Sequence, residues 1–548
     1  MSKFKVNLLA GILLFIFAGL AVSAAHPWAN SPTCDEIAHH IPVGYVLLSK
    51  HDFKMDTSHP PLPRYIVALP LKLFMKINMP AVKAVWRVDD RSIFGRDFFY
   101  KYNKDPLKIV FWSRIAVIFV GLFCGLILFI WARALYGDKV GLLALFLYSF
   151  CPNILAHASL STTDMTATCF TLLSIFIFWL FLKNRSTWCL FFAGSALGLA
   201  QMSKYTALLL YPLFLLLLIF ELPACPKGKR GGLFVEFCGI VFISIIVLWA
   251  GYGFEFRPLL EDAMRASEKS SIIHNLLKNL PLSAGSIDNI LFRVPIPLGA
   301  HLLGILGVLR HGYEGHGIYF LGNWSGHGHP LYFVVAFLIK TPIPALILLM
   351  LGAFAFFRIK IGRNERFIIF TIAVFFLAAS FSKLQLGLRY ILPIYPFLFI
   401  MAARSIEIDK RWVKAAIFVL AGCYIFVNLA IRPHYLSYFN ELIGGPRNGY
   451  KYLRDSNIDW GQDLPALKKY MVKNSIPELT FEYFGQTNPS SYAINYSLFT
   501  EEERKRPQPK VYAVSSQYLE HVLWAKHIKP TALAGFSIFI YDLRNSNH

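Results

Sequence analysis

The chain has few charged residues, and its cysteines follow none of the spacings that organise disulfide-rich or zinc-bound folds. Charged residues make up 16% of its 548 residues, roughly two thirds of the usual share. The eight cysteines form no CxxC pair and no zinc-finger spacing, and most lie within or beside apolar segments. No P-loop is present, so the sequence offers no usual site for nucleotide hydrolysis.

Apolar residues take the place of charge. Hydrophobic residues account for 56% of the chain and aromatic residues for 16%, more than a soluble core requires. About eleven segments are long enough to cross a hydrocarbon layer of about 30 Å as helices. They lie near 8–25, 109–132, 140–156, 165–182, 188–203, 205–222, 233–253, 332–357, 367–381, 387–403 and 413–431. We therefore predict a mostly α-helical, polytopic membrane bundle of about 11 to 13 transmembrane helices.

The net charge of +22 is distributed in short basic clusters between the apolar segments. When successive loops are assigned to alternate sides, most clusters fall on one side, beginning with Lys3 and Lys5 and then Arg133 and Lys139. The positive-inside rule makes that side cytoplasmic. The N-terminus is then cytoplasmic, and nucleic-acid binding is not needed to explain the charge.

This topology divides the chain into a transmembrane domain, 1–431, and an extracytoplasmic domain, 432–548. Two long loops, 26–108 and 254–331, share the outer face with the second domain. Residues 1–25 fit either an uncleaved helix, which we favour, or a signal peptide ending in small residues. Both alternatives leave the following loop outside.

The first external loop carries an acidic pair, Asp35 and Glu36, followed by His59. Residues 34–50 and 60–77 have the pattern of helices that lie along a membrane surface. The pair could cap the first of these helices. It could instead act on a substrate held at the lipid headgroups.

A second acidic residue, Asp164, follows Ser161-Thr162-Thr163 and falls on the same face by the loop count. It could cap the apolar helix that begins there. An ionisable group at a membrane boundary is costly unless it is used, however, and two carboxylates facing one compartment favour a reactive site.

Other polar residues allow two interpretations each. His311, His316, His327 and His329 could bind a divalent metal, although hydrogen-bonding histidines in a flexible loop fit better, and no cofactor is certain. Lys340 begins a span and could meet a phosphate or extend to the interface.

The terminal domain is predicted to be a small α/β unit. Helices are expected near 463–474 and 517–526, and strands near 479–484, 511–516 and 536–542. Asp455, Asp459 and Asp463 do not have the spacing of a calcium loop, and surface exposure with helix capping accounts for them better.

These features together resemble the polyprenyl-phosphate-dependent glycosyltransferases of the GT-C fold, specifically the bacterial type of the branch (family 39-like) that contains protein O-mannosyltransferases and the aminoarabinose transferase of lipid A. The resemblance covers nearly the whole chain. It rests on Asp35-Glu36, His59-Pro60-Pro61-Leu62, Ser161-Thr162-Thr163-Asp164, Tyr319-Phe320-Leu321-Gly322, Lys340-Thr341-Pro342, Leu386-Gly387-Leu388-Arg389-Tyr390-Ile391-Leu392-Pro393, Pro433-His434-Tyr435-Leu436 and Asp455 to Asp463.

The resemblance implies roles for individual residues. Asp35 matches the general base, and Asp164 matches an acidic residue of the same site, with Glu36 beside them as a further catalytic candidate. His59 replaces a lysine that meets the carrier phosphate in the aminoarabinose transferase. The candidates for neutralising and holding the substrate are therefore His59, Arg64, Lys340, Lys383, Arg389 and Tyr390. Ala38 and His39 stand where that transferase has an arginine, a departure from a lipid A enzyme.

The implied activity is an inverting transfer of a hexose or pentose from a polyprenyl phosphate to a protein, glycan or lipid acceptor, outside the bacterial inner membrane. A transporter or lipid flippase is the alternative. Transporters usually place polar sites at the bilayer midplane, whereas these carboxylates lie at a predicted external boundary.

Overall fold

The computed structural model describes residues 2–545 except 54, 81–87, 225, 227, 229, 261–290 and 359–360. Residues 261–290 of the predicted external loop 254–331 therefore lie outside the described residues. The described chain is mostly helical, with a small sheet near its C-terminus, as the sequence predicts.

Five described helices are long and apolar enough to cross a membrane. They are α1 (Lys3–Ala25), α5 (Pro106–Tyr136), α8 (Asp164–Lys183), α11 (Arg230–Gly251) and α19 (Arg411–Ile431). Shorter helices pack among or beside them, namely α9 (Thr187–Gln201), α10 (Leu210–Glu221), α14 (Gly299–Glu314), α17 (Arg363–Ser380) and α18 (Tyr395–Ala403). The apolar helices support an integral membrane protein.

Two further predicted spans are bent pairs of helices. Helices α6 (Asp138–Ser149) and α7 (Pro152–Ala158) meet at 64°, and α15 (Tyr332–Lys340) and α16 (Ile343–Phe357) meet at 111°. Proline lies at each break, where it cannot continue the hydrogen bonding of the preceding helix. The predicted span over 332–357 is therefore a pair of helices with a sharp bend between them. The described residues give five spans, or up to seven if each bent pair is one, and the count of 11 to 13 is not confirmed.

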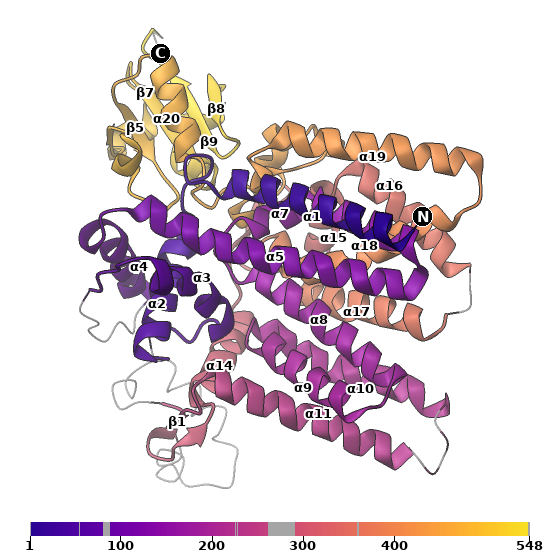
Figure 1. Cartoon of the computed structure of the whole chain (residues 1–548). Coiled ribbons are helices and arrows are strands. Elements are labelled where there is room, and N and C mark those ends of the chain that lie inside the picture. Colours follow the sequence, from indigo (N-terminus) through magenta and orange to yellow (C-terminus); the bar gives the residue numbers. More distant parts are fainter. Residues whose placement is uncertain are drawn as a thin grey trace.

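The first external loop is helical where the sequence predicts helices. It contains the π-helical turn η1 (Glu36–His40), α2 (Ile41–Lys50), α3 (Pro61–Phe74), α4 (Val88–Asp97) and η2 (Phe98–Tyr102). Figure 1 shows α2, α3 and α4 at the same end of the bundle as the terminal sheet and α14, with the N-terminus at the opposite end. The segments predicted to share one face thus gather at one end.

The terminal region contains a five-stranded sheet of order β6-β5-β7-β9-β8. Its strands are β5 (Leu479–Glu482), β6 (Tyr496–Ser497), β7 (Val511–Ser515), β8 (Ala532–Ala534) and β9 (Ile538–Asp542), with α20 (Leu464–Lys473) preceding them. Strand β5 is parallel to both its neighbours, and the other pairs are antiparallel. Two short hairpins, β1 (Phe256–Arg257) with β2 (Ile296–Pro297) and β3 (Ile318–Phe320) with β4 (Asn323–Ser325), lie elsewhere.

The predicted helix at 517–526 is replaced by two 3-10 turns, η15 (Ser516–His521) and η16 (Leu523–Lys526). The three predicted strands and the first helix are present. The short strands β6 and β8, with two and three residues, were too brief for their alternation of apolar residues to reveal them.

The terminal region is hydrogen-bonded to the start of the first loop. The amide of Ser31 donates to the carbonyl of Gln462 at 2.8 Å, and that of Cys34 to the carbonyl of Trp460 at 3.1 Å. The hydroxyl of Thr487 donates to the carbonyl of Pro32 at 2.8 Å. These bonds hold the segment that leads to Asp35.

Candidate active site

Asp35 lies at the start of η1 and is paired with an arginine from a distant part of the chain. Nη1 of Arg389 donates to Oδ2 of Asp35 at 3.1 Å. The Asp35 side chain is 21% exposed and that of Arg389 13% exposed. Asp35 is therefore both paired and accessible to another molecule.

Arg389 is held in place from two sides. It belongs to the 3-10 turn η7 (Leu388–Tyr390), and its Nε donates to the carbonyl of Leu386 at 2.9 Å. Its guanidinium lies 4.3 Å from the centroid of the buried Trp460 ring. A stacked guanidinium is oriented in advance and needs little rearrangement to bind an oxyanion.

Asp164 forms a second ion pair beside the first. Its Oδ1 accepts from Nζ of Lys204 at 2.7 Å, and its Oδ2 accepts from the Thr162 hydroxyl at 3.1 Å. Nδ1 of His157 lies 3.6 Å from Oδ2. The carboxylate is 1% exposed and sits at the N-terminus of α8, where the helix dipole favours negative charge.

Tyr390 joins the two pairs. Nζ of Lys204 lies 4.8 Å from the centroid of its ring, and the guanidinium of Arg389 lies 6.0 Å from it. Arg389 is within the electrostatic influence of both Asp35 and Asp164. The structure thus brings together Asp35, Asp164, Arg389 and Tyr390, four residues singled out in the sequence.

The charges near Asp35 set its protonation state. Burial is the largest single influence and disfavours the carboxylate, but Arg389, His39 and His40 together outweigh it, and the pKa of Asp35 lies below its ordinary value. Burial lowers the pKa of His40 to about 3 and that of His59 well below its ordinary value. Near neutral pH, Asp35 is ionised and both imidazoles are neutral.

His59 lies against His40, with the ring centroids 5.1 Å apart. Because its ring is neutral, His59 can offer a phosphate a hydrogen bond but no full charge. The positive charge in the cluster comes instead from Arg389 and Lys204.

Glu36 has no oxygen to spare for a substrate. Its carboxylate accepts from Nε and Nη2 of Arg114 at 2.8 and 2.7 Å, and it is completely buried. It also accepts from the amides of Thr33 and Ser161, both at 2.8 Å. These bonds join the first loop to α5 and to the segment before Asp164, and the predicted catalytic role of Glu36 stays a prediction.

Arg64 likewise serves the first loop. It is fully buried and donates to the carbonyls of His39, Asp56 and His59, at 3.1, 2.6 and 3.1 Å. It also pairs with the Asp56 carboxylate, which binds Arg91 at 2.5 Å as well. Burial opposes ionisation of Asp56, but these arginines hold its pKa well below the ordinary value. The bonds of Arg64 hold the first loop together, and its predicted contact with phosphate stays a prediction.

Two lysines predicted to bind substrate are also occupied elsewhere. Nζ of Lys340 donates to the carbonyls of Leu436, Tyr438 and Asn457, at 3.0, 3.0 and 2.5 Å, which uses all three of its hydrogens. Nζ of Lys383 donates to the carbonyl of Tyr313 at 3.0 Å, near the end of α14. Neither amine is directed to Asp35 or Asp164 by these bonds.

Lys204, His157 and Trp460 were not proposed as site residues from the sequence. Lys204 carried a signal, because it is a lone basic residue between apolar segments on the predicted external side. Nothing in the sequence indicated a site role for Trp460 beyond its place in a motif. Its contact with Arg389 joins two segments that are far apart in the chain, the terminal region and a 3-10 turn.

The histidine-rich segment does not assemble a metal site within the described residues. Nε2 of His311 lies 3.3 Å from Nδ1 of His316, while the His329 ring packs against Phe320. Throughout the described ranges, no group of three or more His, Cys, Asp or Glu residues is arranged to hold a metal ion. The predicted cluster therefore offers one histidine pair.

The bundle, the helical first loop and the terminal α/β region together have the architecture of the GT-C class of membrane glycosyltransferases. Residues 110–249 match the family model described as dolichyl-phosphate-mannose-protein mannosyltransferase. No curated protein matches the chain by sequence.

Two solved structures extend the likeness to the whole chain. ArnT from Cupriavidus metallidurans bound to undecaprenyl phosphate is 10% identical, with a TM-score of 0.50 and coverage of 98% of both chains. The apo state of the same protein is 11% identical, with a TM-score of 0.50 and coverage of 98% of this chain and 97% of that one. At such identity the structural likeness shows the fold. With the family match, it supports a GT-C glycosyltransferase of the branch that contains ArnT and the protein mannosyltransferases.

Proposed function

We propose that the protein is an inverting glycosyltransferase, which moves a sugar from a polyprenyl-phosphate carrier to an acceptor on the extracytoplasmic side of a bacterial inner membrane. The observation that carries this proposal is the accessible Asp35 carboxylate paired with Arg389, with Tyr390 between this pair and the Asp164–Lys204 pair. A proton acceptor next to fixed positive charge is what this transfer requires.

Asp35 is the proposed general base. Its lowered pKa keeps it ionised, and a modest base suffices because a phosphate is already a good leaving group. It would take the proton of an acceptor hydroxyl as the oxygen forms its bond to the anomeric carbon. The bond from that carbon to the phosphate oxygen breaks at the same time. Attack opposite the leaving group inverts the anomeric configuration.

Arg389 and Lys204 are the proposed partners of the carrier phosphate. Each is now paired with a carboxylate, and an arriving phosphate would share these cations with Asp35 and Asp164. Charge that develops on the departing phosphate is stabilised strongly in a site with little water. Asp164 would keep Lys204 in position, because its own buried carboxylate has little access to an acceptor.

The carrier is proposed to be a polyprenyl phosphate because ArnT, which has the same fold, binds undecaprenyl phosphate. The basic clusters between spans support a cytoplasmic N-terminus and an external site. No comparison favours the alternative, a transporter or flippase.

The test compares Asp35→Asn with the unmodified protein in the release of carrier phosphate from a panel of polyprenyl-phosphate sugars. Loss of a general base should lower turnover by about 10²- to 10⁴-fold. Asp105→Asn is the matched control, since Asp105 is an exposed residue of the same loop with no side-chain cap bond. Equal turnover by Asp35→Asn and the unmodified protein would remove Asp35 from the mechanism.

A further inference from the structure

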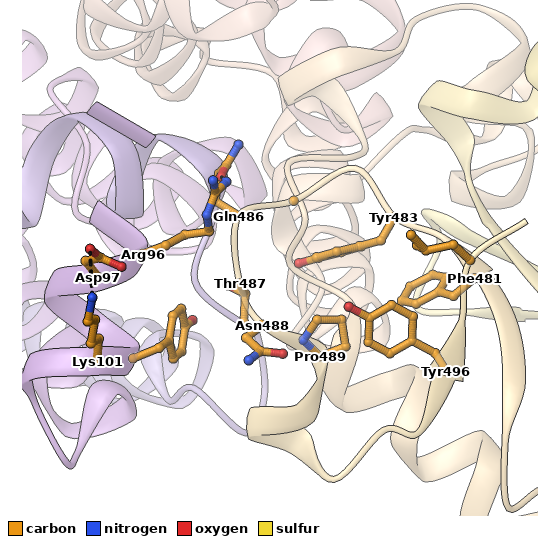
Figure 2. Close-up of a pocket in the computed structure, with 13 residues that line it drawn as sticks. Arg96, Asp97, Lys101, Phe481, Tyr483, Gln486, Thr487, Asn488, Pro489 and Tyr496 are labelled. Atoms are coloured by element: carbon orange, nitrogen blue, oxygen red, sulfur yellow. Dashed lines mark hydrogen bonds and ion pairs between the residues drawn. The ribbon is translucent and has the colours of Figure 1, made fainter. Parts of the chain in front are cut away.

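A cavity separates the first loop from the terminal sheet and is not part of the charged cluster. It has a volume of about 480 Å³ and lies between the α4–η2 segment and the β6 edge of the sheet. Figure 2 shows Arg96, Asp97 and Lys101 on one side and Phe481, Tyr483 and Tyr496 on the other. Its volume falls in the range of roughly 300–1,000 Å³ typical of small-molecule sites.

One wall of the cavity is aromatic. The rings of Phe481 and Tyr483 are stacked with centroids 5.2 Å apart, and Tyr496 meets Phe481 edge to face at 6.2 Å. Tyr496 lies on the edge strand β6 and is 36% exposed. Aromatic faces bind the C–H faces of pyranose rings, through contact with their weakly positive hydrogens.

The opposite wall and the rim are polar. Nη1 of Arg96 donates to Oε1 of Gln486 at 2.6 Å, and Nζ of Lys101 lies 4.0 Å from Oδ2 of Asp97. Asn488 adds a further amide to the lining. Planar amide, guanidinium and carboxylate groups around an aromatic face can satisfy the ring of hydroxyls that a sugar presents at its edge.

The cavity adjoins the segment that holds Asp35. Thr487 of its lining donates to the carbonyl of Pro32, three residues before Asp35. The Tyr483 hydroxyl donates at 2.5 Å to the carbonyl of Gly461, next to the Trp460 that stacks on Arg389. Three residues of chain span at most about 11 Å, so a molecule of a few sugar units in the cavity is within reach of the cluster.

We propose that this cavity binds the saccharide part of the acceptor, so that the acceptor is a glycan or a glycan-bearing molecule. The inference rests on the proposed function and specifies its acceptor. The sugar rings would lie against Tyr496 and the half-buried Tyr483, with their hydroxyls toward Gln486, Asn488 and Lys101.

The experiment measures binding of defined manno-, gluco- and chito-oligosaccharides to the purified full-length protein by saturation-transfer NMR, with an unglycosylated serine- and threonine-containing peptide as the competing ligand class. Tyr496→Ala should weaken saccharide binding by about tenfold or more, as loss of a central aromatic contact does at other binding sites. Tyr496→Phe, which keeps the aromatic face, should restore binding to within about threefold.

The control is Tyr470→Ala, because Tyr470 is on α20 of the same region and does not line the cavity. If Tyr496→Ala lowers the melting temperature, Lys101→Ala on the opposite wall replaces it, with an expected loss of about threefold. The proposal is overturned if no oligosaccharide binds the unmodified protein, if Tyr496→Ala binds as well as the unmodified protein, or if only the peptide binds.

Asp35→Asn separates this inference from the proposed function. Saccharide binding should persist in that variant while release of carrier phosphate falls by about the same 10²- to 10⁴-fold, as expected for a lost general base. Unchanged turnover with intact saccharide binding would refute the role of Asp35 alone. Lost turnover without saccharide binding to any variant would refute the cavity assignment alone.

Discussion

Two arginine–carboxylate clusters lie next to each other, a closed cluster of Glu36 with Arg114 and an open cluster of Asp35 with Arg389, and their difference separates a structural role from a chemical one. In one, Glu36 and Arg114 are completely buried and every oxygen of Glu36 has a donor. In the other, Asp35 and Arg389 keep 21% and 13% exposure and share one hydrogen bond. Glu36 and Asp35 are neighbours in one loop but differ in role, because they differ in the number of hydrogen-bond donors around them and in their exposure to solvent.

Breaking the closed cluster should produce the largest effect on stability. Arg114→Ala removes the only ion-pair partner of Glu36 among the described residues and leaves a charge buried without compensation. The expected loss of stability is about 3–5 kcal/mol, measured by thermal unfolding in detergent.

A double variant tests whether the pair acts as a unit. Glu36→Gln combined with Arg114→Met should recover part of the loss, because no uncompensated charge remains. A melting temperature of Arg114→Ala equal to that of the unmodified protein would contradict the assignment of this cluster to structure.

The open cluster should respond in activity rather than stability. Arg389→Lys keeps the positive charge but loses the planar fork and the stacking on Trp460. We expect kcat/KM to fall by about 100-fold with little change in melting temperature. Lys383→Ala is the control, since the sequence predicted both residues for the same phosphate and the structure places Lys383 against Tyr313. A larger loss from Lys383→Ala than from Arg389→Lys would reverse the assignment.

The sequence predicted the helical bundle well because apolar segments of membrane length leave few alternatives. It did not reveal the bend within 332–357, where apolar composition continues through an angle of 111°. Hydropathy does not record direction, and only Pro342 and Pro344 marked the break. The sequence also did not predict β6 and β8, which have only two and three residues.

The site was predictable in its acidic residues and less so in its cations. Asp35 and Asp164 stood out because charge is rare at a membrane boundary. Choosing among Arg64, Lys340, Lys383 and Arg389 needed the fold, because each is simply a basic residue near an apolar segment. Three of them are committed to protein oxygens, whereas Arg389 faces Asp35.

Asp459 sharpens the comparison because it is buried like Glu36 but lacks a cation. It is fully buried and accepts from the amide of Gly461 and the hydroxyl of Ser516, both at 3.2 Å, which corrects the expectation that it is exposed. No arginine, lysine or histidine of the described residues lies within ion-pair distance of it. Burial raises the pKa of Asp459 to about 7, although the Gly461 amide opposes the shift.

The pH dependence of stability follows from this raised pKa. The folded protein binds a proton at Asp459 up to about pH 7, whereas the unfolded chain releases it near about pH 4. Stability is therefore greater at pH 6 and falls by roughly 1 kcal/mol towards pH 8. Asp459→Asn should remove this pH-dependent loss, so that its stability relative to the unmodified protein is higher at pH 8 than at pH 6. The control variant Asp105→Asn should keep the loss. If the melting temperatures of Asp459→Asn and of the unmodified protein changed by the same amount between pH 6 and 8, the pKa of Asp459 would not be the cause of this pH dependence.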